Sequence, residues 1–335
     1  VRLEPSEPVV RRFTEVVPST DAVNLLPNSS FECRTSGWGS IADLPGWGGN
    51  LNLLVGEVDT TTARFHGSSF KIALTSESLP VFYFDYFPLY RVPVKAPLLA
   101  NRGWIEVEPD VDYTLSAYMK SDAEGLVGVL SVRRAFRGSL KRRVQLTTGW
   151  RRYTFTFYPH AEQIFIALGL DLEASRREAG TVWIDGVQLE RGSEATPYRP
   201  RATVEVGLET DRLGNIFRYG EEPEMRAMLF NSDEIPHTVT LHLQTTDFDD
   251  IVVHEDALSV DVPPGQTVEV PVRPGVRRKG FYRLHLRAEG AEVSLTRPLR
   301  FAIIEPYTKT DSLFGMNHAY PWPYLLDLSG EIGLR

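Results

Sequence analysis

Aromatic side chains are dense between Val81 and Tyr90, where the sequence reads VFYFDYFPLY. Side chains alternate between the two faces of a strand, so Tyr83 and Tyr86 would point to opposite sides of this segment. Trp47 lies in a glycine-rich loop. Aromatic rings stack on the C–H faces of sugars, and nearby polar groups bind the hydroxyls. These residue types therefore indicate a surface that binds a sugar chain.

Tyr118 and Arg133 extend this candidate surface. Alternation in the run from Tyr113 to Lys120 groups Leu115 with Ala117 on one face and puts Tyr118 on the other. Arg133 could reach the same surface. Aromatic side chains also fill the cores of β-sandwiches, and that alternative stays open. The expected sugar-binding residues are Tyr118, Trp47, Tyr83, Tyr86 and Arg133.

No comparable pattern indicates catalysis. The sequence has no Gly-x-Ser-x-Gly elbow and no convincing pair of carboxylates of the kind that a glycosidase uses. We therefore expect the chain not to be an enzyme. Cys33 is the only cysteine, so an intrachain disulfide is impossible, and we expect a small buried side chain there.

Composition narrows the classes of partner. The 335 residues carry 36 Lys and Arg against 44 Asp and Glu, a formal net charge of −8. This charge disfavours a nucleic-acid-binding protein, which usually presents a basic stripe. No apolar run approaches the roughly 18 residues of a membrane span, so we expect no membrane partner. The sequence opens at Val1 without a signal peptide, as the mature or trimmed form of a secreted protein would.

Alternation with a period of two recurs along the chain, and helical periodicity is almost absent before residue 319. Short alternating runs separated by Gly, Pro and Asp turns are typical of β-sandwiches. A segment at 198–203, with one proline and two arginines, separates two series of such runs. We therefore predict an all-β fold with two sandwiches. The clearest runs are Tyr113 to Lys120, Arg152 to Phe157, Gln163 to Leu170 and Gly280 to Leu286.

Six motifs in the first part of the chain carry a family resemblance. They are Asn24 to Glu32, His66 to Ile72, Tyr113 to Tyr118, Thr148 to Phe155, Val182 to Glu190 and Ala195 to Tyr198. In this order they make residues 22–200 resemble the galactose-binding-like jelly roll of carbohydrate-binding modules in families four, nine, sixteen and twenty-two. The resemblance implies a jelly-roll β-sandwich with Trp38 and Trp150 in its core.

The same resemblance implies a structural calcium ion. Calcium takes six to eight oxygen ligands, and backbone carbonyls contribute alongside carboxylates. Glu32 and Asp185 would supply side chains, and Ser30 and Ser68 would supply carbonyls.

The remaining segments resemble parts of a larger enzyme. Residues 203–304, with the turn Pro263-Pro264-Gly265, resemble an immunoglobulin-like β-sandwich of the accessory type. Residues 305–335, with Phe314-Gly-Met-Asn-His318, resemble a linker and the first strand and helix of a glycosidase (β/α)8 barrel, which needs roughly 250 residues. Residues 1–21 are expected to form an extended arm. The resemblance thus implies that the catalytic barrel is missing from this chain.

The leading hypothesis is a non-catalytic carbohydrate-binding and scaffolding segment of a secreted, extracellular glycoside hydrolase that acts on plant-type polysaccharide. Its ligand would be a β-glucan or xylan type of chain, bound weakly. One alternative is a purely structural pair of accessory domains that brace the barrel. Another is a complete enzyme. Exposed aromatic rings would favour the carbohydrate-binding hypothesis over the purely structural one.

Overall fold

The computed structural model describes residues 16–17, 23–44, 47–51, 54–84, 90–135, 138–290, 298–306 and 308. At 16–17, 43–44, 47–51, 81–84 and 90–92 it describes the backbone alone. Most of the predicted arm, Tyr86 and most of the barrel-like segment therefore lie outside the described residues. Among the residues described, no helix is long and apolar enough to cross a membrane.

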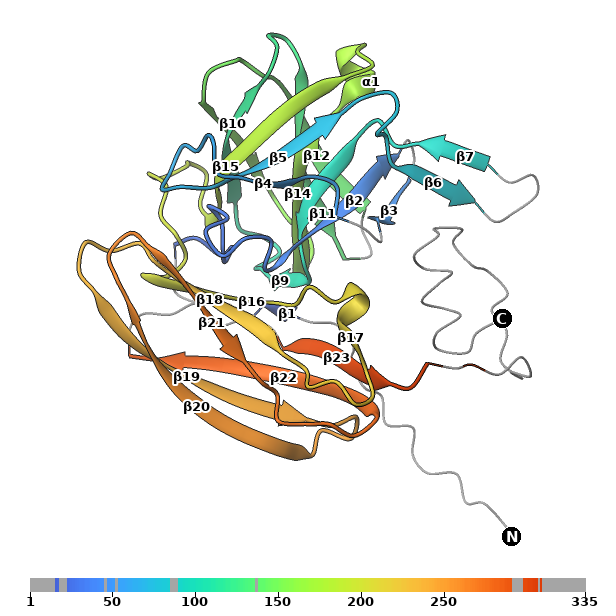
Figure 1. The fold of residues 1–335 in the computed structure, drawn as a ribbon. Helices are drawn as coiled ribbons and strands as arrows, with labels where there is room; N and C mark the ends of the chain where they lie inside the picture. Colours follow the sequence, from blue (N-terminus) through green and yellow to red (C-terminus); the bar gives the residue numbers. More distant parts are fainter. Residues whose placement is uncertain are drawn as a thin grey trace.

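Two sheets form the first sandwich, in the upper half of Figure 1. The eight-stranded sheet contains, in order, β1 (Val16–Val17), β9 (Trp104–Glu106), β14 (Gln163–Leu170), β8 (Pro97–Asn101), β2 (Trp38–Leu44) and β3 (Trp47–Leu51), with β11 (Val127–Arg134) and β12 (Gly138–Gln145) branching from β14. The five-stranded sheet contains β13 (Arg151–Phe157), β10 (Tyr113–Ser121), β15 (Gly180–Arg191), β5 (Ser69–Leu74) and β4 (Glu57–Asp59). Strands β6 (Val81–Phe84) and β7 (Tyr90–Pro93) form a separate hairpin, and α1 (Leu172–Ser175) is a single turn.

The core of this sandwich follows from the alternation in its strands. Leu115 and Met119 of β10 and Leu168 of β14 belong to one cluster of buried apolar side chains. Trp38 is 1% exposed in the same cluster, and its ring lies 5.3 Å from that of Phe31. The predicted core position of Trp38 is confirmed.

A second, smaller sandwich follows in the chain, in the lower half of Figure 1. Its buried cluster includes Val206, Leu229, Leu241 and Phe301. The all-β prediction is confirmed, and the immunoglobulin-like type of the second sandwich stays a prediction. Its three-stranded sheet contains, in order, β16 (Val204–Glu209), β18 (Met225–Asn231) and β21 (Thr267–Val272). Its five-stranded sheet contains, in order, β17 (Ile216–Arg218), β23 (Leu299–Ile304), β22 (Gly280–Glu289), β19 (His237–Thr246) and β20 (Val252–Val262). The 3-10 turn η1 (Leu213–Asn215) precedes β17.

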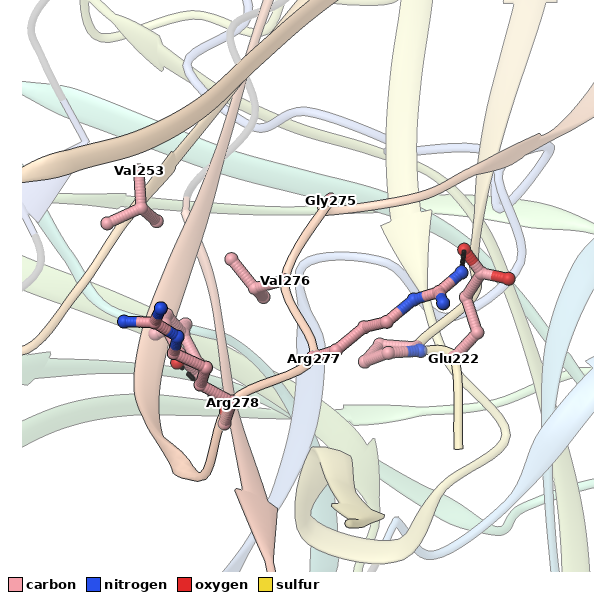
Figure 2. A pocket seen from close by; sticks show the side chains of 8 residues that line it. Glu222, Val253, Gly275, Val276, Arg277 and Arg278 are labelled. Carbon is pink, nitrogen blue, oxygen red and sulfur yellow. Dashed lines mark hydrogen bonds and ion pairs between the residues drawn. The ribbon is translucent and has the colours of Figure 1, made fainter. Parts of the chain in front are cut away.

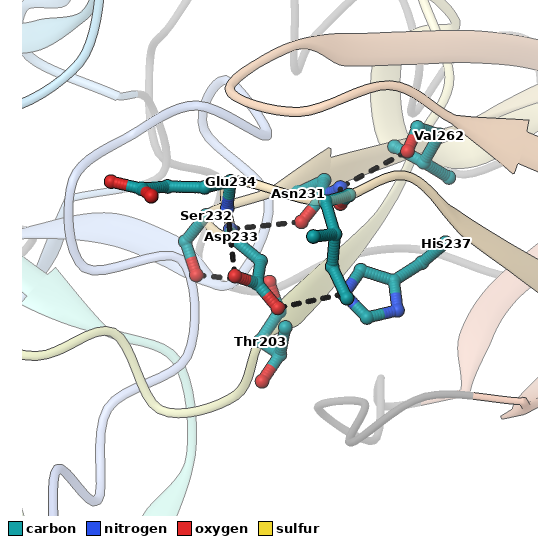
Figure 3. A network of polar contacts seen from close by, with 8 residues as sticks. Thr203, Asn231, Ser232, Asp233, Glu234, His237 and Val262 are labelled. Atoms are coloured by element: carbon teal, nitrogen blue, oxygen red, sulfur yellow. Dashed lines mark hydrogen bonds and ion pairs between the residues drawn. The ribbon is translucent and has the colours of Figure 1, made fainter.

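Asn231 holds the turn between β18 and β19 in shape (Figure 3). Its side-chain amide donates to the carbonyls of Ile235 at 2.7 Å and Val262 at 3.0 Å. Its side-chain oxygen accepts the N–H of Asp233 at 2.9 Å, and Asp233 in turn bonds His237 at 3.0 Å. These polar side chains bond one another and the backbone of the turn, so the network has a structural role.

The two sandwiches contact each other through the segment before β2 and the three-stranded sheet. The Cys33 thiol, fully buried as predicted, lies 3.5 Å from the carbonyls of Glu205 and Met228. A Cβ added at Gly207 would lie 2.8 Å from the Cβ atoms of Cys33 and Ser36. The backbones therefore approach closely enough that only glycine fits at position 207 without a shift.

Candidate functional site

The outer face of the five-stranded sheet in the first sandwich carries polar and aromatic side chains. Met119 of β10 is buried in the core, so its neighbours Tyr118 and Lys120 point to the outer face. Strand register pairs Lys120 with Trp183 of β15 and Tyr118 with Arg152 of β13. Three strands thus bring aromatic and cationic groups together.

The chain itself closes one half of this face. Residues 192–199 follow β15 and fold back across the sheet. Thr114 Oγ1 donates to the carbonyl of Gly192 at 2.8 Å, and the N–H of Arg199 donates to Gln188 Oε1 at 2.9 Å. Both sheet residues, Thr114 and Gln188, are fully buried as a result. The half that contains Tyr118 and Lys120 stays partly accessible.

Lys120 lies against two indole rings on the accessible half. Its Nζ is 4.8 Å from the ring centroid of Trp183 and 5.4 Å from that of Trp150, and it donates to Thr62 Oγ1 at 2.9 Å. Both tryptophans are partly exposed. Apolar ring surface and a charged donor therefore stand side by side. We call the surface formed by Lys120, Trp150 and Trp183 the indole face.

Asp59 fixes the orientation of one indole ring. Trp183 Nε1 donates to Asp59 Oδ2 at 2.8 Å, while the hydroxyl and N–H of Thr61 donate to Oδ1 at 2.6 and 2.7 Å. These hydrogen bonds, the Thr61 hydroxyl first, hold the pKa of Asp59 at about 2. The carboxylate stays ionised, and the indole is held in place before any ligand arrives.

Tyr118 is enclosed by neighbours beside the indole face. The guanidinium carbons of Arg64 and Arg152 lie 5.1 and 5.7 Å from its ring centroid. The Phe65 ring meets it edge-on at 5.1 Å. Tyr118 therefore acts as a support for two guanidinium groups more than as an open stacking platform.

The other predicted sugar-binding residues lie on different elements. Arg133 of β11 belongs to the eight-stranded sheet, where it faces Phe165 across the strand pair. Trp47 begins β3 of that sheet, and Tyr83 lies in the β6–β7 hairpin. Tyr86 lies outside the described residues. Tyr118 and Arg133 occupy opposite layers of the sandwich, so the structure does not bring the predicted set to one surface.

Sequence reasoning missed the indole face. Trp150 was expected in the core, yet it is partly exposed and contacts the Lys120 ammonium. Alternation could have found Trp183, because its neighbours Val182 and Ile184 are buried core residues. Trp150 lies in the loop before β13, where no alternation indicates which way a side chain points.

The predicted calcium-binding carboxylates do lie close together. The N–H groups of Arg64 and Phe65 donate to Asp185 Oδ2 at 2.6 and 2.8 Å. The N–H groups of Gly67 and Ser68 donate to Glu32 Oε1 at 3.0 and 2.8 Å. Both carboxylates therefore hold the single loop 64–68.

The charges of these two carboxylates are poorly compensated. Burial raises the pKa of Asp185 to about 7, and the charge of Glu32 adds to the rise. Burial also raises the pKa of Glu32, against the hydrogen bonds from Gly67 and Ser68. Among the described residues, no Lys, Arg or His forms an ion pair with either carboxylate, and no group of three or more His, Cys, Asp or Glu is placed to hold a metal ion. Further ligands to an ion here would have to be carbonyls or water.

A pocket of about 630 Å³ lies in the second sandwich (Figure 2). Arg277 points toward Glu222 and forms an ion pair with it at 3.0 Å, whereas Arg278 points the other way. Val253 and Val276 supply apolar wall. Glu222 is the one carboxylate among the described lining residues, so the pocket lacks the paired carboxylates of a glycosidase.

The comparisons with known proteins point to solved structures alone. No family model matches the chain, and no curated protein matches it. The chain is similar to a family 61 carbohydrate-binding module solved with β-1,4-galactotriose, at 16% identity and a TM-score of 0.35, covering 50% of this chain and 99% of that one. It is also similar to a family 4 carbohydrate-binding module, at 19% identity and a TM-score of 0.30, covering 47% of this chain and 95% of that one.

A third similar structure contains a carbohydrate-binding module and a catalytic module. It is the Clostridium thermocellum xylanase 10B, a family 22 carbohydrate-binding module joined to a family 10 glycoside hydrolase module and solved with xylohexaose. The identity is 11% and the TM-score 0.30, covering 50% of this chain and 29% of that one.

Proposed function

We propose that the first sandwich binds a carbohydrate chain on the indole face. The observation that carries this proposal is the placement of two partly exposed indole rings beside the Lys120 ammonium, with Asp59 holding one ring in position. Rings of this kind present apolar area to the C–H face of a sugar, and the ammonium and carboxylate can bond its hydroxyls. Stacking plus a few hydrogen bonds would give millimolar to micromolar affinity, a binding free energy of about −4 to −8 kcal/mol.

We propose further that the chain serves as the non-catalytic binding and scaffolding segment of a secreted, extracellular glycoside hydrolase acting on plant-type polysaccharide. The contact between the sandwiches supports a scaffolding role, because Cys33 and Gly207 leave little space for relative movement. The ligand would be a β-linked glucan or xylan type of chain. The competing function is a structural brace without a sugar site.

The experiment is retardation on polysaccharide gels and titration calorimetry with the full chain and a panel of soluble glucans, xylans and galactans. Trp183→Ala should weaken binding about fivefold, because an aromatic contact contributes about 1 kcal/mol. Trp104→Ala is the matched control, since Trp104 is partly exposed on the eight-stranded sheet and packs on Phe165 at 5.1 Å. Absence of binding across the panel would favour the structural brace, and loss with the Trp104 variant alone would move the site to the other sheet.

We also propose a structural calcium ion at the loop 64–68. The buried carboxylate of Asp185 and the partly buried one of Glu32, neither with a cationic side-chain partner among the described residues, have the donor chemistry that a hard cation prefers. Glu32 and Asp185 would hold the ion, with carbonyls of Ser30 and Ser68 as predicted. A bound ion would stabilise the folded state by about 2.7 kcal/mol at a hundredfold excess over its Kd.

Removal of the metal tests this site. The melting temperature should fall with a chelator and recover with calcium, and Asp185→Asn should abolish that response. An unchanged melting temperature together with a metal-free elemental analysis would rule the site out.

A further inference from the structure

Three cationic side chains at the indole face have no anionic partner. Lys120 bonds Thr62 and lies against two indoles, Arg152 Nη2 donates to Ser116 Oγ at 2.8 Å, and Arg64 lies over Phe65 and Tyr118. Among the residues that the structure describes, no carboxylate forms an ion pair with any of the three. The Asp59 carboxylate lies at the same face, but it bonds Trp183 Nε1 and Thr61 and none of these three cations.

Several other cations of the same sandwich do pair with carboxylates. Lys71 pairs with Glu57 at 3.5 Å, and Lys95 pairs with Glu178 at 3.3 Å. Arg191 pairs with Glu108 at 2.8 Å. The three neighbouring cations outnumber the Asp59 carboxylate at this surface, so they leave an excess of positive charge in a chain whose net charge is −8. Such an excess attracts an anionic ligand.

The shape of the surface restricts what the anion can be. Tyr118 and Lys120 are two positions apart on one face of β10, about 7 Å along the strand, so the guanidinium groups around Tyr118 lie next to the indole rings. Guanidinium groups bind carboxylates through paired N–H donors, and an ammonium binds one as a point charge. Indole rings need an apolar ring face beside that charge. A sugar that carries a carboxylate offers both.

We infer that the indole face, together with Arg64 and Arg152, binds an acidic glycan: a β-linked chain with uronic acid units. This inference rests on the proposed sugar-binding function of the same face and names its ligand class. The rings take the sugar faces, and Lys120, Arg64 and Arg152 take the carboxylates. No covalent step is involved.

The test compares matched glycans and matched variants of the full chain. Glucuronic-acid-substituted xylan and neutral arabinoxylan are titrated at about 0.05 M and about 0.5 M NaCl, where screening differs strongly. The acidic xylan should bind at least about fivefold more tightly at low salt, and this advantage should shrink at high salt. Lys120→Met should lose about tenfold in affinity for the acidic xylan, the size of one charge-assisted hydrogen bond. The loss for the neutral xylan, to which the ammonium can bond only hydroxyls, should be clearly smaller. Lys95→Met, which removes the same charge from a paired surface lysine, should change neither.

Each other outcome has a distinct meaning. Equal, salt-independent binding of both xylans that Trp183→Ala weakens would overturn the acidic-ligand inference and keep the sugar-binding function. No binding of either xylan, or binding that Trp183→Ala leaves intact, would overturn both. Equal losses in the Lys120 and Lys95 variants, or equally tight binding of polyglutamate, would reveal a general attraction of polyanions and also overturn the inference.

Discussion

Glu205 is the most informative residue to change for stability, because its carboxyl group is buried where the two sandwiches meet. The side chain is 1% exposed. It accepts the N–H of Arg201 at 3.3 Å, and the N–H groups of Asn28 and Ser29 in the first sandwich also bond it. Burial nevertheless raises the pKa of Glu205 from 4.5 to about 7, because desolvation outweighs these hydrogen bonds and the attraction of Arg201.

The direction of the pH effect follows from that pKa. Because the folded value exceeds the unfolded one, the folded protein binds more protons than the unfolded chain between pH 4.5 and about 7. The stability that the neutral carboxyl confers is present below pH 4.5 and is lost as the pH rises through about 7. The difference between the two pKa values corresponds to about 3 kcal/mol of unfolding free energy. Glu205→Gln cannot ionise and keeps an acceptor oxygen, so it should match the wild type near pH 5 and exceed its stability by up to about 3 kcal/mol at pH 8.

The assay is urea unfolding of both proteins at the two pH values, followed by tryptophan fluorescence. Glu209→Gln is the control. Glu209 lies on the same strand and accepts the Thr35 hydroxyl at 2.6 Å across the same boundary, but it is partly exposed. If the gain of Glu205→Gln comes from burial of its carboxyl group, Glu209→Gln should not reproduce it. If Glu205→Gln is no more stable than the wild type at pH 8, or gains equally at both pH values, the reasoning from burial is wrong.

Two further predictions concern the same contact between the sandwiches. Cys33 is fully buried, and its burial raises the pKa of the thiol well above 9.0. A thiol reagent should therefore leave the native protein unmodified and react fully after unfolding. Rapid reaction of the native protein would contradict the buried position. Gly207→Ala would place a Cβ 2.8 Å from Cys33 and Ser36, so it should destabilise the protein by about 1 to 3 kcal/mol in urea unfolding. Gly149→Ala, where a Cβ would meet nothing within 4 Å, should cost little, and equal effects of the two substitutions would show that the contact is loose.

Much of the strand structure could be predicted from the sequence, because alternation is a local property. The run Gln163 to Leu170 coincides with β14, and Tyr113 to Lys120 lies within β10. The expected buried set of β10, including Leu115 and Met119, is in the core. Each strand needs one apolar face to bury, and residues two positions apart in the sequence form that face.

The composition of the candidate site could not be predicted in the same way, because it depends on which strands become neighbours. Sequence alternation put Tyr118 on an outer face but could not tell that Arg133 belongs to the opposite layer. Lys120, Trp150 and Trp183 come from separate segments, and they meet only when β10 pairs with β13 and β15. The fold-back of residues 192–199 then closes one half of the face and leaves the indoles at the other. The sequence by itself determined which side of each strand is apolar, and long-range strand pairing, which no local pattern encodes, decided which outer-face residues share a surface.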